Sequence, residues 1–186
     1  MPKQPPGKTL MRISLTALFA ALIAAGAFIA IPIGPIPIVL QNLFALLSGL
    51  VLGPLLGTAA VGLYLLAGVL NFPVFAGATG GIAHFAGPTG GFLIGYLLAA
   101  LTAGLITGSR TSPGTIRLIA AVTTGFLVVY IPGIIWLNIS GNLGWIKAIF
   151  TGFIPFIPGD IFKGIAAVII VPRLRRITVD YIPVAR

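Results

Sequence analysis

The chain of 186 residues has no cysteine, a single histidine and only two acidic residues, Asp160 and Asp180. The lack of cysteine excludes disulfide bonds, thiolate metal sites and cysteine nucleophiles. Only 7% of the residues are charged, whereas a soluble domain carries about 25%. So few charged side chains cannot cover the surface of a soluble globular protein, and this class is therefore excluded.

Hydrophobic residues make up 58% of the chain and form long runs separated by glycine and proline. A helix needs about 20 mostly apolar residues to cross the roughly 30 Å of hydrocarbon in a bilayer. The sequence therefore predicts an all-α, polytopic integral membrane protein of the cell membrane, with a single membrane domain over residues 1–186. The six transmembrane helices that we expect are Ile13–Ile31, Val39–Leu52, Leu56–Leu70, Phe92–Ile106, Ile116–Leu137 and Pro158–Val171.

Segments rich in glycine and proline interrupt these spans. A turn at Gly53-Pro54 makes the second and third spans a tight helical hairpin, and three longer irregular segments share one side of the membrane: Pro32–Pro37, Asn71–Gly91 and Asn138–Gly159. Within the last of these we expect an interfacial or partly re-entrant stretch over residues 138–155. Irregular backbone at membrane depth is tolerated only against protein or a water-filled cavity. The pattern therefore predicts a cavity that opens on this side.

The net charge of +9 indicates membrane topology. The cations lie in the gaps between apolar runs and are not grouped with aromatic platforms, so we expect no nucleic-acid partner. With six spans, both termini lie on one side of the membrane. The cations on that side are Lys3, Lys8, Arg12, Arg110, Arg117, Arg173, Arg175, Arg176 and Arg186, and those on the other side are Lys147 and Lys163. The positive-inside rule puts both termini, with tails 1–12 and 176–186, in the cytoplasm and the Gly/Pro-rich loops on the outer face. A signal peptide over residues 1–26 is the disfavoured alternative, because the apolar run continues to Ile31.

Asp160 and Lys163 form the ionisable pair inside the predicted spans. With a spacing of i and i+3 at the start of the last helix, they share one face of one turn. An isolated charge at this depth costs several kcal/mol, so the two side chains need each other or a polar ligand, and both are candidate substrate-binding residues. In the alternative interpretation, Asp160 only caps its helix and Lys163 extends to the membrane surface.

Two glycine clusters, Gly77–Gly81 and Gly87–Gly91, form the second candidate feature. Neither follows a strand, so neither is a dinucleotide fingerprint or a phosphate loop. Glycine brings backbone amides close to a ligand oxygen, and the second cluster leads into the positive end of a helix. A tightly packed loop without ligand is the alternative. The candidate substrate contacts here are Gly77, Gly80, Thr89 and Gly90.

Other polar and aromatic residues allow two interpretations each. Gln41 offers its amide either to a ligand or to a neighbouring helix. Phe75 and Tyr130 fit a cavity wall or an aromatic belt at the membrane interface. His84 has no second metal ligand nearby, so we expect no metal site. Since no place supplies an acid, a base and a nucleophile together, we expect neither an enzyme nor a cofactor.

Ala17, Ala21 and Ala25 repeat at a spacing of four residues along the first span. Small residues in one stripe let another helix approach closely. The stripe therefore marks either a partner-binding surface or internal packing of the bundle.

Five segments in this order resemble one known family: Pro37–Gln41, Leu52–Pro54, Asn71–Gly77, Gly87–Leu93 and Pro155–Lys163. Together they are similar to the BioY family, the biotin-specific substrate-capture (S) components of energy-coupling factor (ECF) transporters. The resemblance covers nearly the whole chain.

The resemblance implies a six-helix subunit that binds biotin from the outer side with high affinity. It implies as partners a transmembrane coupling subunit and two ATPase subunits, which use ATP in place of this chain. By the same likeness Asp160 and Lys163 contact biotin, the glycine loop acts as a lid, and the alanine stripe meets the coupling subunit. Val39 stands where the family usually has threonine, and Pro132 follows Tyr130 in the fifth span.

Biotin carries a urea, a sulfur-containing ring and a carboxylate, and our hypothesis is that Asp160 accepts hydrogen bonds from the urea N–H groups. Two alternatives stay open from the sequence. The chain is a capture subunit for another vitamin, such as thiamin or riboflavin, or it is a passive channel for small solutes.

Overall fold

The computed structural model describes residues 6–32 and 36–181. Five helical segments in this part are long and apolar enough to cross a membrane. They are α1 (Pro6–Phe28), α2 (Gln41–Val69), α4 (Gly90–Thr107), α5 (Thr115–Gly141) and a segment made of α6 (Trp145–Gly152), the 3-10 turn η1 (Ile154–Phe156) and α7 (Ile157–Thr178). The shorter elements are β1 (Ala30–Ile31), β2 (Ile38–Val39), α3 (Ile82–Ala86) and the 3-10 turn η2 (Val179–Tyr181).

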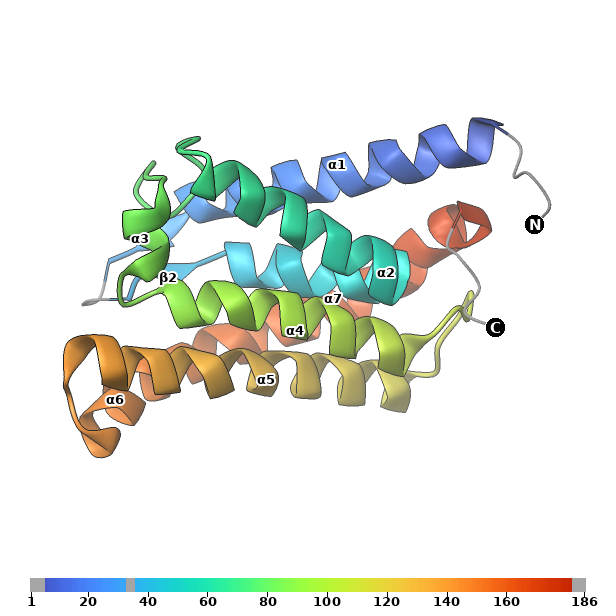
Figure 1. The fold of residues 1–186 in the computed structure, drawn as a ribbon. Helices are drawn as coiled ribbons and strands as arrows, with labels where there is room; N and C mark the ends of the chain where they lie inside the picture. Colours follow the sequence, from blue (N-terminus) through green and yellow to red (C-terminus); the bar gives the residue numbers. More distant parts are fainter. Residues whose placement is uncertain (1–5, 33–35, 182–186) are drawn as a thin grey trace.

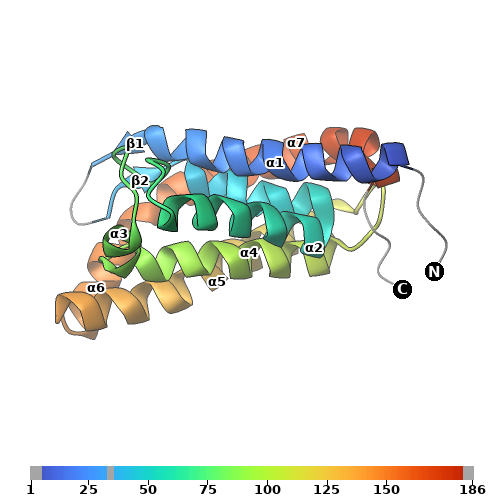
Figure 2. The same cartoon turned by 45° about the horizontal axis from the view of Figure 1, so that its top comes forward.

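The helices form one bundle in which α1, α2, α4 and α5 pack in chain order, and α7 packs against α2 and α5 (Figure 2). Figure 1 shows β2, α3 and α6 together at one end of the bundle, which we name the loop end. The start of α1, the α4–α5 connection and η2 lie at the opposite, terminal end. There Arg12 Nε donates a hydrogen bond to the carbonyl oxygen of Tyr181 over 2.6 Å.

The predicted hairpin at Gly53-Pro54 is confirmed within α2. Gly53 has φ 80° and ψ 179°, a left-handed conformation that glycine adopts at little cost. Ser48 Oγ donates to the carbonyl oxygen of Gly57 over 3.0 Å, although residues nine positions apart in a straight helix would be separated by about 13.5 Å along the axis. The two halves of α2 therefore run back along each other, as their cyan and teal ribbons show in Figure 1.

The limits of three helices differ from the prediction. α1 begins at Pro6 where we expected Ile13, α5 continues beyond Leu137, and α7 continues beyond Val171 to Thr178. The predicted limits follow the apolar runs, whereas helical hydrogen bonding continues through the polar residues and the glycine and proline at the ends of these runs. The expected all-helical fold also contains one short exception, the antiparallel pairing of β1 with β2. The predicted break at Pro32–Pro37 falls partly outside the described residues.

The stretch 138–155, predicted to be broken, is mostly helical. It holds the last turn of α5 and all of α6. The break is short and lies between these two helices, where Asn142 and Gly144 have positive φ values of 46° and 79°. The direction of the chain therefore changes at two left-handed residues, and a longer irregular loop is not needed.

Arg175 lies at the terminal end with the other cations predicted for that side, but it belongs to α7 and is not in a loop. Its side chain is 0% exposed. One guanidinium nitrogen donates to the carbonyl oxygen of Arg110 over 2.8 Å, and the other donates to that of Gly108. These carbonyls follow the C-terminus of α4, where a cation is favoured by the helix dipole. Arg175 therefore fastens the α4–α5 connection to α7.

Candidate functional site

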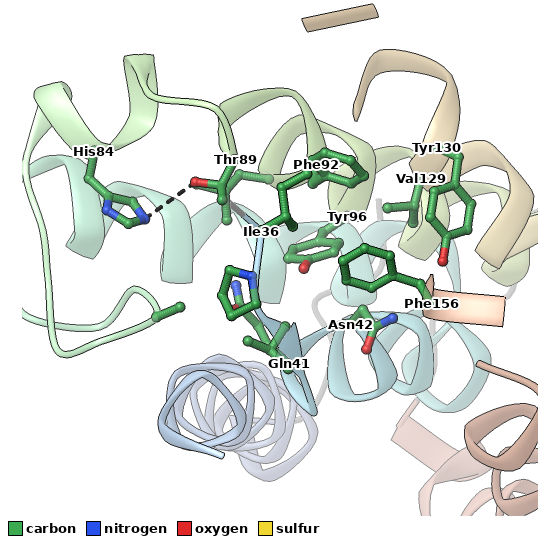
Figure 3. Close-up of a pocket in the computed structure, with 14 residues that line it drawn as sticks. Ile36, Gln41, Asn42, His84, Thr89, Phe92, Tyr96, Val129, Tyr130 and Phe156 are labelled. Atoms are coloured by element: carbon green, nitrogen blue, oxygen red, sulfur yellow. Dashed lines mark hydrogen bonds between the residues drawn. The ribbon is translucent and has the colours of Figure 1, made fainter. Parts of the chain in front are cut away.

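A pocket opens near the loop end of the bundle, where β2, α2, α3, α4, α5 and η1 meet (Figure 3). Its volume is about 540 Å³, a figure that includes the open space at its mouth. The lining residues are Ile36, Pro37, Val39, Gln41, Asn42, Ala76, His84, Thr89, Phe92, Leu93, Tyr96, Val129, Tyr130 and Phe156.

At one end of the pocket four buried polar side chains form a closed cluster, which we name the deep cluster: Asn42, Tyr130, Asp160 and Lys163. Asn42 Nδ2 donates to Asp160 Oδ1 over 2.9 Å, and Lys163 Nζ donates to Asn42 Oδ1 over 2.8 Å. Lys163 Nζ also lies 3.2 Å from Asp160 Oδ1, and the Tyr130 hydroxyl donates to Asp160 Oδ2. Both charges are therefore paired and hydrogen-bonded, as burial requires.

The predicted i, i+3 pair of Asp160 and Lys163 is present. Lys163 does not extend to the membrane surface, because its side chain is held in the deep cluster and the residue is only 9% exposed. Asn42 and Tyr130 line the pocket, whereas the carboxylate and the ammonium group lie directly behind them. In this arrangement the ion pair orients and polarises the two groups that face the cavity.

Aromatic rings form the walls. Phe92, Tyr96, Tyr130 and Phe156 all line the pocket and are less than 10% exposed. The ring of Tyr130 meets that of Phe92 edge-on at a centroid distance of 6.3 Å. Edge-to-face contacts of this kind add stability beyond the burial of area, so the walls are pre-formed.

Gln41 bonds to a neighbouring helix, as one of the two interpretations has it, and its contact with a ligand stays a prediction. It lines the pocket, and its Nε2 donates to the hydroxyl of Tyr64. Gln41 begins the first half of α2, and Tyr64 lies in the second half. The same amide therefore joins the two halves of the hairpin and presents a polar group to the cavity.

The mouth of the pocket is formed around His84, which Figure 3 shows with Thr89 at the opposite end from Tyr130. Its Nδ1 lies 2.9 Å from Thr79 Oγ1, and its Nε2 lies 3.4 Å from Thr89 Oγ1. The imidazole stacks on the ring of Phe75 at a centroid distance of 5.0 Å. Burial lowers the pKa of His84 below its ordinary value, which favours the neutral ring.

Phe75 does not form a wall of the pocket in the structure. Its side chain is 0% exposed and packs in the core between Tyr64 and His84. Its N–H donates to the carbonyl oxygen of Thr79 over 2.9 Å, which closes a turn at Gly77 (φ 76°). Phe75 therefore supports the mouth from behind, and its predicted contact with a ligand stays a prediction.

The three candidate glycines also lie outside the pocket lining in the structure. Gly80 packs on the carbonyl of Phe72, and Gly90 packs on that of Phe85, so close backbone packing accounts for both. Gly77 faces open space in its turn. The glycine loop contributes Ala76 and His84 to the lining, with Thr89 just before α4. Contacts of Gly77, Gly80 and Gly90 with a ligand stay predictions.

Sequence reasoning missed Asn42, Tyr96 and Phe156 as lining residues and treated His84 only as an improbable metal ligand. Asn42 had a usable signal, because an amide inside an apolar span is costly and needs a partner. Tyr96 is a polar aromatic residue in the fourth predicted span and carries the same kind of signal. In residues 6–32 and 36–181, no group of three or more side chains is arranged to hold a metal ion.

The alanine stripe lies on the outside of the bundle. Ala17, Ala21 and Ala25 are exposed, whereas Ile23 and Ala27 of the same helix are fully buried. Internal packing of the stripe, one of the two open interpretations, is therefore wrong. The exposed small residues leave this face of α1 accessible to another helix or to lipid.

Comparison with known proteins gives matches along nearly the whole chain. The model of the BioY family matches residues 1–180. The probable biotin transporter BioY of Pyrococcus horikoshii is 45% identical over 163 residues, which cover 88% of this chain and 95% of that protein. The biotin transporter BioY of Thermotoga maritima is 40% identical with the same coverage.

A solved structure shares the fold. The crystal structure of the S-component for biotin from an ECF-type ABC transporter superposes with a TM-score of 0.86. It is 34% identical in sequence, and the match covers 94% of this chain and 95% of that chain. The match therefore includes both the bundle and the segments around the pocket.

Proposed function

Because the chain belongs to the BioY family, we propose that it is the high-affinity biotin-binding subunit of a vitamin uptake transporter, a multi-pass protein of the cell membrane. The observation that carries this proposal is the pocket at the loop end, with the deep cluster at its base and aromatic walls above it. A buried charge pair next to a cavity is costly and functional by default in a membrane protein. Its relatives are named biotin transporters.

The chemistry of the pocket suits the parts of biotin. A urea has both N–H donors and a carbonyl acceptor, and Asn42 and Tyr130 offer an amide and a hydroxyl at the deep end. The apolar ring fits the faces of Phe92 and Phe156. The carboxylate then lies toward the mouth, near Thr89 and His84. Asp160 already accepts from Asn42, Tyr130 and Lys163, and a carboxylate accepts about four hydrogen bonds, so one place on Oδ2 is left for a urea N–H.

We assign six membrane segments to this subunit by counting the two halves of α2 separately. Both termini lie in the cytoplasm and the Gly/Pro-rich loops lie on the outer face in this assignment. Exposed cations at the terminal end support it, among them Lys8, Arg110, Arg173 and Arg176, whereas Lys147 lies in α6 at the loop end. Biotin therefore enters from outside.

The exposed stripe of Ala17, Ala21 and Ala25 is the surface that meets a transmembrane coupling subunit in this proposal. Two ATPase subunits bound to that partner supply the energy, so the chain itself uses no cofactor and catalyses no reaction. The exposure of the stripe supports the proposal, as does the description of the solved relative as an S-component of an ECF-type transporter.

Calorimetry on the purified chain in lipid nanodiscs tests the function. The expected result is saturable binding of one biotin per chain, with no heat from thiamin or riboflavin. Tight binding of another vitamin would assign a different capture subunit. Flux of small solutes through liposomes that hold only this chain, without a saturable site, would identify a passive channel.

A further inference from the structure

A second hollow lies on the side of the bundle, between α5 and α7, and we name it the lateral groove. Its volume is about 1210 Å³ including the space at its open side. The walls are apolar, with Phe126 and Leu127 from α5 and Ile161, Ile165 and Ile169 from α7. All but Phe126 are exposed large hydrophobic residues. The groove is therefore open to whatever surrounds the bundle.

The groove has the length of one bilayer leaflet. Along α7 its lining runs from Ile157 to Ile169, which corresponds to about 18 Å at about 1.5 Å per residue. One leaflet contributes about 15 Å of hydrocarbon. At Gly164 the two helices are in close contact, since a Cβ there would lie 3.1 Å from a methyl carbon of Val122. This contact makes the floor of the groove.

Two cations continue the face of α7 that lines the groove, toward the terminal end. Arg173 and Arg176 follow Ile169 by four and seven residues, and a helix puts such positions on one face. Both are exposed. Within residues 6–32 and 36–181 neither makes a described ion pair, and the nearby carboxylate of Asp180 is exposed and unpaired with them. Two available positive charges thus lie about one and two helical turns beyond the last lining residue of the groove.

We infer that the lateral groove binds one acyl chain of an anionic phospholipid, whose phosphate is held by Arg173 and Arg176. A zwitterionic lipid such as phosphatidylcholine also carries a phosphate, but its choline cation offsets that charge, so two arginines without acidic partners favour a lipid of net negative charge. A second transmembrane helix fits the groove less well than an acyl chain. Close approach of a helix needs small residues, whereas the walls carry branched and aromatic side chains, and Gly164 is already covered by α5.

The bound acyl chain would also affect the pocket at the loop end. Tyr130 lines both the pocket and the lateral groove, and Asp160 lines the groove. An acyl chain reaching from Arg173 toward Gly164 would cover the groove side of the deep cluster. Water would then be kept from the ion pair, and electrostatic interactions within it would strengthen.

Native mass spectrometry of the full chain, titrated with phosphatidylglycerol or phosphatidylcholine of the same chain length, tests the inference. The expected result is one retained phosphatidylglycerol with a clear preference over phosphatidylcholine. Arg173→Gln/Arg176→Gln should reduce that preference about 25-fold, at roughly fivefold for each arginine near an anionic group. The control is Lys8→Gln/Lys147→Gln, which removes the same charge elsewhere and should keep it.

A steric pair of variants tests the groove itself. Ile165→Trp fills the groove and should abolish retention of the lipid, whereas Ile170→Trp on the same helix, outside the lining, should not. Equal lipid binding by all variants would overturn the inference. Retention that depends on the arginines but not on Ile165 would overturn the acyl-chain part, and a dimer cross-linked through the groove would show that a second copy occupies it.

Discussion

The two ends of the pocket differ in how their polar groups are held. At the deep cluster Asn42, Tyr130, Asp160 and Lys163 are all less than 10% exposed, and their charges are paired. At the mouth, a single neutral imidazole rests on Phe75 and contacts two threonine hydroxyls. The deep end contains full charges in a low-dielectric site, and the mouth contains none.

This difference assigns separate roles to the two ends. Groups that are fixed before the ligand arrives lose little entropy on binding, so the deep cluster is suited to affinity and selection. The mouth belongs to a glycine-containing loop, and loops open more easily than packed helices. Changes at the deep end should therefore affect affinity far more than changes at the mouth.

The largest effect is expected for Asp160→Asn. It leaves the buried ammonium group of Lys163 without its carboxylate, and loss of one partner of a buried pair costs about 3–5 kcal/mol. Biotin affinity measured by calorimetry should fall more than 100-fold, and thermal stability should fall with it. Asp180→Asn, at the other acidic residue of the chain, should change neither.

A double variant separates stability from binding at the same site. Asp160→Asn/Lys163→Met removes both charges, so much of the lost stability should return, whereas biotin affinity should stay low. Recovery of affinity in the double variant would contradict a role for the ion pair in capture.

A smaller loss is expected for Tyr130→Phe. The variant keeps the ring that packs on Phe92 but removes the hydroxyl that donates to Asp160. A hydrogen bond to a charged group contributes about 1.5–3 kcal/mol, so biotin affinity should fall about 10- to 100-fold. Tyr181→Phe, at the terminal end, is the matched control, and an equal loss there would point to a general effect on the fold.

At the mouth the expected effect is a modest dependence on pH. Because burial lowers the pKa of His84, the unfolded loop binds more protons than the folded loop below about pH 6.5. The loop is therefore most stable above this pH and becomes less stable as the pH falls. Limited proteolysis of residues 71–91 between about pH 5 and pH 8 measures this. In His84→Gln the part of the pH dependence that is due to His84 should disappear, and an unchanged profile would refute the assignment.

The smallest effect on the pocket is expected for Ala21→Leu, on the exposed face of α1. Biotin affinity should stay within about twofold, because surface substitutions usually change stability by less than about 0.5 kcal/mol. Biotin uptake by cells that hold the partner subunits should fall sharply if this face packs on a coupling subunit. Ala120→Leu, exposed on α5, should leave uptake unchanged.

The features that the sequence predicted depend on short-range chemistry. The Gly53-Pro54 turn and the pairing of Asp160 with Lys163 follow from glycine conformation, helix periodicity and the cost of buried charge. These arguments need only a few neighbouring residues, which a sequence always supplies.

The features that it did not predict depend on which helices become neighbours. Arg175 resembles an exposed loop cation in the sequence, and its burial depends on the carbonyls after α4 that lie beside it. Asn42 joins the deep cluster only because α2 packs on α7. Phe75 is turned into the core by its turn with Thr79. Tertiary contacts decide each of these positions, and local patterns do not record them.

An experimental map of the chain crystallised with biotin tests the central claim most directly. The account predicts biotin in the pocket lined by Asn42, Tyr96 and Tyr130, with its urea against the deep cluster and its carboxylate toward His84 and Thr89. Density for biotin at any other place, with this pocket free of ligand, would contradict the account.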